Sequence, residues 1–230
     1  MKGIFYGIGI GPGDPEHITL KAFRTMKEVD VIAAPGTDVK ETLAYRIAVQ
    51  AVPEIEQKEM LPIDMPMTMD KELLLKAHKN GAENIEKVLV EGKSIGFITL
   101  GDTTVYSTFS YLEKIVKGHG FETVYISGIT SFCAAAASLG IPLTEWQEPL
   151  HVVPAVHQLD DKLALDGSYV LMKSGRQMPK VKEILRASGR KVNMVENCGL
   201  PDEKKYYSVE DIPDGAGYFS LIIAKENKKK

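Results

Sequence analysis

A short apolar run ends abruptly at a glycine and an aspartate in the middle of the chain. Residues 95–100 (IGFITL) lead into Gly101 and Asp102, and five hydroxyl-bearing side chains occur in the next six positions. The pattern predicts a buried strand that delivers a carboxylate to its carboxyl end. Ligands of open α/β sheets bind beyond the carboxyl ends of the strands, so this position favours a binding site. The simpler alternative is that Asp102 only caps the next helix.

A second strand with a glycine-rich exit opens the chain. Residues 3–10 form an apolar run that enters the loop 9–14 (GIGPGD). Asp14 is suited to be the N-cap of a helix whose first residue is Pro15. That helix is expected to carry apolar side chains on one face. These side chains are Ile18, Ala22 and Met26.

The glycine loop does not complete a dinucleotide-binding fingerprint. When the pattern is counted from Gly7, Pro12 occupies the position of the last required glycine. When it is counted from Gly9, Asp14 occupies that position. Pro12 has no N–H group, so the loop lacks a donor where a phosphate cradle would use one. A ligand without phosphates therefore fits better than NAD, which disfavours an NAD-dependent oxidoreductase.

Strands and helices are expected to alternate through the first half of the chain. The expected strands are 29–34, 59–63, 95–100 and 123–126, and the expected helices are 42–52, 71–91 and 106–117. This alternation indicates a mostly parallel sheet with helices on both faces. Later, helices are expected at 131–139 and 179–188 and strands at 152–153, 169–172, 191–195 and 218–224. The fold class is therefore α/β with two α/β domains, 1–126 with the glycine-rich loop and 127–230 with a mixed sheet.

Three motifs in order give the chain a family resemblance. Residues 6–14 (YGIGIGPGD), 101–109 (GDTTVYSTF) and 127–137 (SGITSFCAAAA) together resemble the tetrapyrrole methylase family. The runs at 106–109 and 132–134 are similar to the branch that methylates C20 of precorrin-2 or cobalt-factor II in cobalamin biosynthesis. One departure is Thr103, because the family usually has proline after the glycine–aspartate pair.

The resemblance implies a cofactor and the residues that hold it. Two α/β domains would enclose the active site in the cleft between them, and the cofactor would be S-adenosyl-L-methionine. The implied cofactor-binding residues are Ile10, Gly101, Asp102, Val105, Thr130, Ser131, Met172, Phe219 and Ser220. Glycines admit the ligand to the backbone, Asp102 accepts hydrogen bonds, and Met172 offers an adaptable apolar wall. Thr130 and Ser131 are alternatively helix caps, and Met172 an ordinary core residue.

The implied acceptor is a tetrapyrrole that carries acetate and propionate groups. Cationic side chains recognise such carboxylates locally, even in a chain of net charge -3. The candidate substrate-binding residues are Pro12, Arg46, Lys173 and Arg176. Asp102 or Tyr106 is the candidate catalytic group that removes the C20 proton, with water as the alternative. Tyr106 alternatively stacks on the macrocycle or packs at the start of a helix.

Composition excludes several other classes. With 44% hydrophobic and 26% charged residues the chain is of ordinary globular type. It has no apolar run of the roughly 20 residues that a membrane span needs, and its start runs into a strand rather than a signal peptide. A cytoplasmic protein is expected, with no membrane partner. No basic patch interleaved with aromatic residues supports nucleic-acid binding.

The remaining chemistry-bearing residues are expected to be structural. Cys133 and Cys198 are interpreted as buried thiols without a catalytic role. The five histidines lack a metal-ligand spacing, so no metal is expected. Of the five histidines, only His151 and His157 are candidates to approach the substrate or a cobalt ion within it. Trp146 is either an interface anchor or a core residue.

Alternative functions stay open from sequence. They are methylation of another tetrapyrrole position, diphthine synthesis on the same fold, and a corrinoid-binding module without activity. The resemblance implies a homodimer. It leaves open whether the acceptor contains cobalt.

Overall fold

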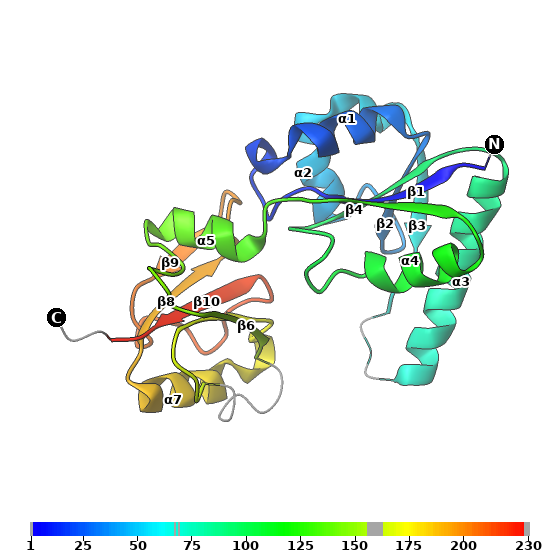
Figure 1. The fold of residues 1–230 in the computed structure, drawn as a ribbon. Helices are drawn as coiled ribbons and strands as arrows, with labels where there is room; N and C mark the ends of the chain where they lie inside the picture. The colour runs from blue at the N-terminus through cyan, green and yellow to red at the C-terminus, as the bar shows by residue number, and fades with distance from the viewer. Residues whose placement is uncertain (1, 67, 69, 156–162, 228–230) are drawn as a thin grey trace. The chain divides into compact units, whose positions relative to one another are not determined.

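The computed structural model describes residues 2–66, 68, 70–155 and 163–227, and its chain forms two compact units (Figure 1). The first unit is Met1–Thr130 and the second is Ser131–Lys230. The predicted division after residue 126 lies four residues before this one. The described residues include no helix long and apolar enough to cross a membrane.

The first unit is built on a wholly parallel sheet. Its strands are β1 (Ile4–Gly9), β2 (Val31–Pro35), β3 (Glu59–Ile63), β4 (Ile95–Thr99) and β5 (Glu122–Ile126). They lie in the order β3-β2-β4-β1-β5, with each neighbouring pair parallel. The carboxyl ends of β1, β4 and β5 therefore lie next to one another at one end of the sheet. The sequence predicts ligand binding at this end.

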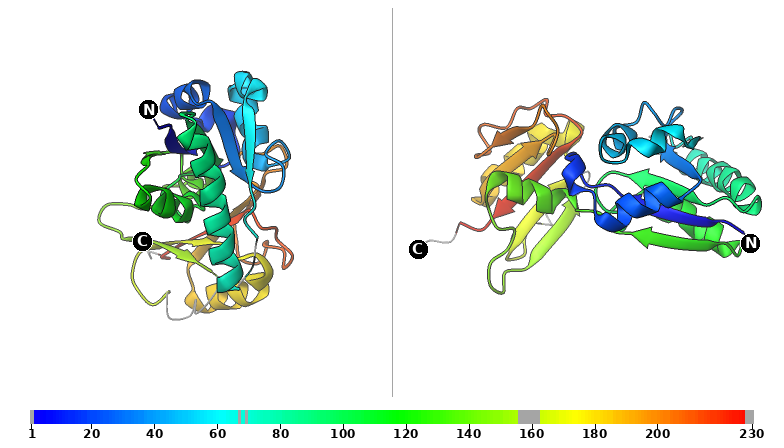
Figure 2. Two further views of the ribbon diagram at one scale, coloured as in Figure 1. Left: turned by 90° about the vertical axis from the view of Figure 1, so that its right-hand side faces the viewer. Right: turned by 90° about the horizontal axis from the view of Figure 1, so that it is seen from above.

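Helices cover both faces of this sheet. They are α1 (Leu20–Glu28), α2 (Leu43–Ala51), α3 (Lys71–Val90) and α4 (Phe109–Gly118), with the short 3-10 helices η1 (Pro15–His17) and η2 (Pro53–Gln57). Phe5, Phe97 and Phe109 pack with α3 side chains in one apolar cluster. Figures 1 and 2 show α1 and α2 on the face opposite α3 and α4.

The prediction that a single helix starts at Pro15 is wrong. Asp14 accepts a hydrogen bond from the Glu16 N–H at 2.8 Å, but the turn that it caps ends at His17. Ile18 is extended, and Thr19 caps α1 by accepting from the Ala22 N–H at 3.2 Å. Thr19 Oγ1 also donates to the Ser127 carbonyl at 3.4 Å. A second good capping residue therefore restarts the helix, and the Ile18 side chain is not on its buried face.

The second unit carries a mixed sheet. Its elements are α5 (Ser131–Leu139), β6 (Leu150–Pro154), β7 (Ser168–Met172), η3 (Gly175–Gln177), α7 (Met178–Ser188), β8 (Lys191–Glu196), β9 (Lys204–Tyr206) and β10 (Ser220–Lys225). The strand order is β6-β7-β10-β8-β9, in which β6 and β7 are parallel and the other pairs antiparallel. One apolar cluster joins the sheet to α7 and another joins it to α5. The mixed α/β sheet agrees with the sequence prediction, and β9 is an additional edge strand.

Candidate functional site

The exits of β1 and β4 are joined by backbone hydrogen bonds. The Gly11 N–H donates to the Gly101 carbonyl at 3.2 Å, and the Gly101 N–H donates back to Gly11 at 2.8 Å. Gly101 has φ +70°, which favours glycine. A Cβ at Gly128, after β5, would lie 2.2 Å from the Gly101 oxygen. The three loops therefore pack against one another through their backbones at this end of the sheet.

Asp102 links two of these loops. It is 7% exposed, and its Oδ2 accepts from the Gly128 N–H at 2.9 Å. Its Oδ1 accepts from the Thr104 N–H at 2.8 Å and also from Thr104 Oγ1. Because α4 begins only at Phe109, the alternative that Asp102 caps the next helix is wrong. The carboxylate instead closes its own turn and ties it to the exit of β5.

Thr103 occupies the position where the family usually has proline. Its side chain is fully buried, and Oγ1 donates to the Ile126 carbonyl, the last residue of β5, at 3.3 Å. This hydrogen bond joins the β4 exit to β5 next to the Asp102 contact. The turn is thus fixed by a side-chain hydrogen bond rather than by a proline ring.

Val105 and Tyr106 continue the loop before α4. Val105 is half-buried and its N–H donates to the Asp102 carbonyl at 3.4 Å. Tyr106 is exposed and has φ +50°, an uncommon conformation for a bulky residue. The helix predicted to begin at Tyr106 therefore begins three residues later, at Phe109, because this turn of the backbone precedes it. Strained residues of this kind cluster at functional sites.

The start of α5 carries a polar atom without a partner. Thr130 directly precedes the helix that begins at Ser131, as predicted. Thr130 Oγ1 is buried and makes no hydrogen bond within the described part of the chain. Buried hydroxyls are normally satisfied, so this oxygen is a candidate contact for a bound ligand.

The remaining predicted cofactor residues lie at one end of the second sheet, where β6, β7 and β8 end and β10 begins. We call this end the second edge. Met172, the last residue of β7, pairs with Leu221 of β10 and with Pro154 of β6. Ser220, the first residue of β10, pairs with Glu196 at the end of β8. Met172, Phe219 and Ser220 are therefore close in the fold, although Met172 and Phe219 are 47 positions apart in the sequence.

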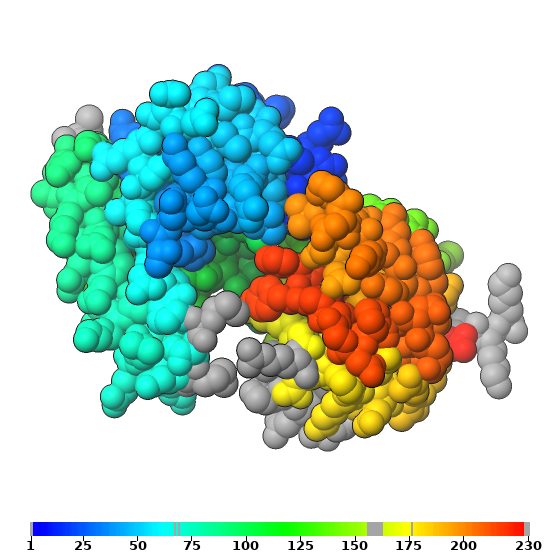
Figure 3. Space-filling model, turned by 180° about the vertical axis from the view of Figure 1, so that it is seen from behind, coloured from blue at the N-terminus to red at the C-terminus, as the bar shows by residue number. Residues whose placement is uncertain are grey.

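The side chains at this edge differ in exposure. Met172 is half-buried, so it both packs in the apolar cluster of α5 and reaches the surface. Ser220 is buried and donates from Oγ to the Gly217 carbonyl at 2.7 Å. Phe219 is exposed, and its ring meets that of Tyr218 edge-on at 5.2 Å. In Figure 3 the orange-red segment that precedes β10 lies on the surface.

The predicted substrate-binding residues are not all at these edges. Lys173 is exposed directly after β7, with φ +60°. Arg176 lies in η3, and its side chain is outside the described part of the chain. Pro12 is half-buried in the glycine loop. Arg46 is exposed on the helix α2 and is not part of a strand exit.

Sequence reasoning missed three residues at the second edge. Glu196 accepts from the Gly217 N–H at 2.6 Å, and Asn197 adopts φ +55°. Ser174 is fully buried, and its hydroxyl has no partner among the described residues. No spacing in the sequence marks these residues, because the antiparallel pairing of β10 with β8 and with β7 is what brings them near Ser220.

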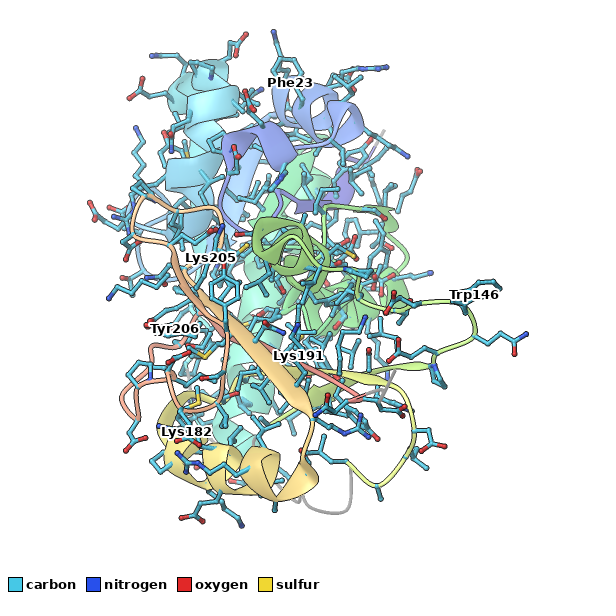
Figure 4. The ribbon with its side chains drawn as sticks, turned by 90° about the vertical axis from the view of Figure 1, so that its left-hand side faces the viewer. Phe23, Trp146, Lys182, Lys191, Lys205 and Tyr206 are labelled. Carbon is cyan, nitrogen blue, oxygen red and sulfur yellow. The ribbon has the colours of Figure 1, made fainter. Side chains whose placement is uncertain are left out.

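Two structural interpretations from sequence are wrong. Cys133 is exposed rather than buried, because it lies on the outward side of α5. Cys198 is half-buried, and burial together with Glu203 raises its pKa to about 11. Trp146 is not a core residue: its side chain is fully exposed and projects from the loop before β6 (Figure 4).

Two of the described histidines, His151 and His119, contact nearby side chains or carbonyls. His151 stacks on Tyr169 at 4.6 Å and donates from Nε2 to the Asp166 carbonyl at 2.9 Å. His119 contacts Glu86 at 2.8 Å. His157 lies outside the described residues. In the part that is described, no group of three His, Cys, Asp or Glu side chains is arranged to hold a metal ion.

Comparisons with known proteins agree with the motifs. The family model of the Tetrapyrrole (Corrin/Porphyrin) Methylases matches residues 5–212. The chain is 35% identical to a probable cobalt-precorrin-2 C(20)-methyltransferase of Methanocaldococcus jannaschii, covering 97% of this chain and 96% of the relative. It is 29% identical to a precorrin-2 C(20)-methyltransferase of Sinorhizobium, covering 96% and 94%. A solved uroporphyrin-III C-methyltransferase of Thermus thermophilus, complexed with S-adenosyl homocysteine, matches with TM-score 0.71 at 21% identity, covering 97% and 98%.

Proposed function

Because the chain belongs to the tetrapyrrole methylase family, we propose that it methylates C20 of precorrin-2 or cobalt-factor II with S-adenosylmethionine, in cobalamin biosynthesis. The observation that carries the proposal is the near full-length similarity to two relatives, both of them named as C20-methyltransferases. The names differ in the metal content of the acceptor. Both forms are therefore acceptors to test.

The residues at the two sheet edges suit S-adenosylmethionine, which supplies a methyl group activated by a sulfonium when bound. Gly9, Gly11 and Gly128 let the exits of β1, β4 and β5 pack closely, because a Cβ at each would lie within 3 Å of another atom. The unpartnered Thr130 hydroxyl can accept or donate one hydrogen bond. Met172 offers an adaptable apolar contact. We assign Ile10, Val105, Ser131, Phe219 and Ser220 to cofactor binding from the family resemblance.

Alignment of the methyl group with C20 is the main task of the protein. Well-oriented reactants gain a large part of their acceleration from orientation alone. Asp102 contributes by holding the exits of β4 and β5 in one arrangement through its contacts to Thr104 and Gly128. Its two oxygens are engaged in these contacts, which favours positioning over proton transfer. Tyr106 or a water molecule then accepts the C20 proton.

Carboxylates of the acceptor require cations. Lys173 is the candidate that stands beside Met172 at the second edge, so we propose that it contacts an acetate or propionate group. Arg176 follows three residues later in the chain. Pro12 contributes shape from the glycine loop. Arg46 has the weakest support, because its side chain is exposed on the helix α2.

The assembly belongs to the same proposal. We propose a homodimer in the cytoplasm, which the family resemblance favours. The fully exposed Trp146 is a suitable anchor for a subunit interface. Light scattering of the purified protein and of Trp146→Ala tests this: a dimeric mass that falls in the variant supports both statements, and a monomeric wild type contradicts the homodimer.

The experiment that tests the activity offers two acceptors in parallel. Purified protein is incubated with S-adenosylmethionine and either metal-free precorrin-2 or cobalt-factor II, and products are resolved by mass. We expect one added methyl group on at least one acceptor. Cofactor binding without methylation of either acceptor would refute the C20 assignment and turn attention to diphthine synthesis, another ring position or a corrinoid-binding module.

A further inference from the structure

An exposed aromatic pair stands directly before β10. Tyr218 is 53% exposed and Phe219 is 44% exposed, and their rings meet edge-on. Binding costs less free energy when the contacting side chains and their backbone are already ordered. The contacts that fix the backbone of this segment therefore bear on any ligand that the two rings bind.

Contacts from the end of β8 hold that backbone at two points. Glu196 Oε1 accepts from the Gly217 N–H at 2.6 Å, and the Asn197 N–H donates to the Phe219 carbonyl at 3.1 Å. A Cβ at Gly217 would lie 2.8 Å from Glu196 Oε1, so the carboxylate lies tightly against the backbone there. Ser220 Oγ closes the turn on the Gly217 carbonyl.

The Glu196 carboxylate is itself fixed at its other oxygen. Tyr206 of β9 donates from its hydroxyl to Oε2 at 3.2 Å. Burial and the neighbouring Glu196 raise the pKa of Tyr206, which keeps this hydroxyl a donor. Tyr206 is labelled in Figure 4 beside the strand β8. One carboxylate thus joins an edge strand to the segment before the central strand.

The residues that follow the two neighbouring strands of β10, β7 and β8, both have left-handed backbone conformations. Lys173 follows β7 with φ +60°, and Asn197 follows β8 with φ +55°. Neither is glycine, and such conformations persist where the surrounding structure enforces them, often at ligand sites. Asn197 is fixed further by a hydrogen bond from Nδ2 to Asp202 at 2.6 Å.

We propose that Glu196 is a positioning residue for cofactor binding: it holds the segment Gly217–Ser220 so that Phe219 and Ser220 contact S-adenosylmethionine. This rests on the function proposed above, and it adds a residue that the motifs do not contain. Glu196 acts through the backbone of Gly217 and does not touch the reacting atoms.

The test compares Glu196→Ala with Glu196→Gln and with a matched control. A glutamine retains an acceptor for the Gly217 N–H and a partner for the Tyr206 hydroxyl, whereas alanine removes both. The control is Glu226→Ala, because Glu226 Oε1 also accepts from a glycine N–H, that of Gly167, at the opposite edge of the same sheet. Binding of S-adenosylhomocysteine is measured by titration calorimetry, with thermal unfolding and steady-state kinetics on each variant.

Glu196→Ala is expected to bind S-adenosylhomocysteine roughly tenfold more weakly, about the effect of one hydrogen bond that glutamine can still make. The KM for the cofactor should rise by a similar factor, while the KM for the acceptor stays within about twofold. Glu196→Gln and Glu226→Ala should bind like wild type, even though Glu226→Ala loses thermal stability.

Gly217→Ala perturbs the same contact from the other side and keeps the inference testable if Glu196→Ala does not fold. If Glu196→Ala and Gly217→Ala both bind S-adenosylhomocysteine as tightly as wild type, the positioning role is overturned. Equal weakening by Glu226→Ala would overturn it also, because the effect would then be general instability. Failure of wild type to bind S-adenosylhomocysteine at all would instead refute the proposed function.

Discussion

Replacing Asp102 by alanine removes the link between the exits of β4 and β5. The side chain is 7% exposed and accepts three hydrogen bonds, two from Thr104 and one from Gly128. Thr104 is exposed, so water replaces the partner of its N–H and hydroxyl. The Gly128 N–H is half-buried and loses a charged acceptor, which costs about 1.5–3 kcal/mol. We expect a destabilisation of about 2–3 kcal/mol for the first unit.

The assay is thermal unfolding followed by circular dichroism, together with binding of S-adenosylhomocysteine. For a unit of this size the loss corresponds to a fall of the midpoint by about 8 °C. Glu113→Ala is the matched control in the same unit, since Glu113 is similarly buried and accepts from Thr123 Oγ1 at 2.8 Å on α4, away from the strand exits. Both variants should lose stability, and only Asp102→Ala should also lose cofactor affinity. An Asp102→Ala protein as stable as wild type would refute the reasoning.

Three further predictions concern single residues. Gly128→Ala should abolish cofactor binding, because its Cβ would lie 2.2 Å from the backbone oxygen of Gly101; calorimetry that finds wild-type affinity contradicts this. Iodoacetamide at pH 8 should alkylate the exposed Cys133 well before Cys198, whose pKa burial raises to about 11; peptide mass spectrometry checks the order. For Glu203, burial raises the pKa but hydrogen-bond donors outweigh it and lower it below 4.5. Its stabilisation is full above about pH 4.5 and lost as pH falls through the lowered pKa. Glu203→Gln should therefore flatten the acid limb of a stability profile, and an unchanged limb would contradict this.

The parts of the fold that sequence predicts are those with strong local signals. The strand Glu59–Ile63 and the helix Ser131–Leu139 have the predicted limits, because composition changes sharply at their ends. The helix after the glycine loop is interrupted since Thr19 offers a second cap with a long-range hydrogen bond to Ser127. The strand β9 has only three residues, two of them exposed lysines, which give no apolar periodicity.

The residues of the candidate site likewise divide into those with a local sequence signal and those that depend on contacts between distant segments. Gly101 and Asp102 are predictable because the glycine–aspartate pair follows a buried strand directly. The destination of the Asp102 carboxylate is not predictable, since its partner Gly128 lies 26 residues away. Glu196 escapes sequence reasoning for the same reason: its role depends on the antiparallel pairing that places Ser220 beside it.

The most direct test of the central claim is the position of the transferred methyl group. The protein is incubated with S-adenosylmethionine labelled with carbon-13 in the methyl group and with the acceptor that gains mass, and the product is examined by carbon-13 nuclear magnetic resonance. The account predicts one enriched methyl group, bonded to C20 of the macrocycle. An enriched methyl group on any other ring carbon would contradict it.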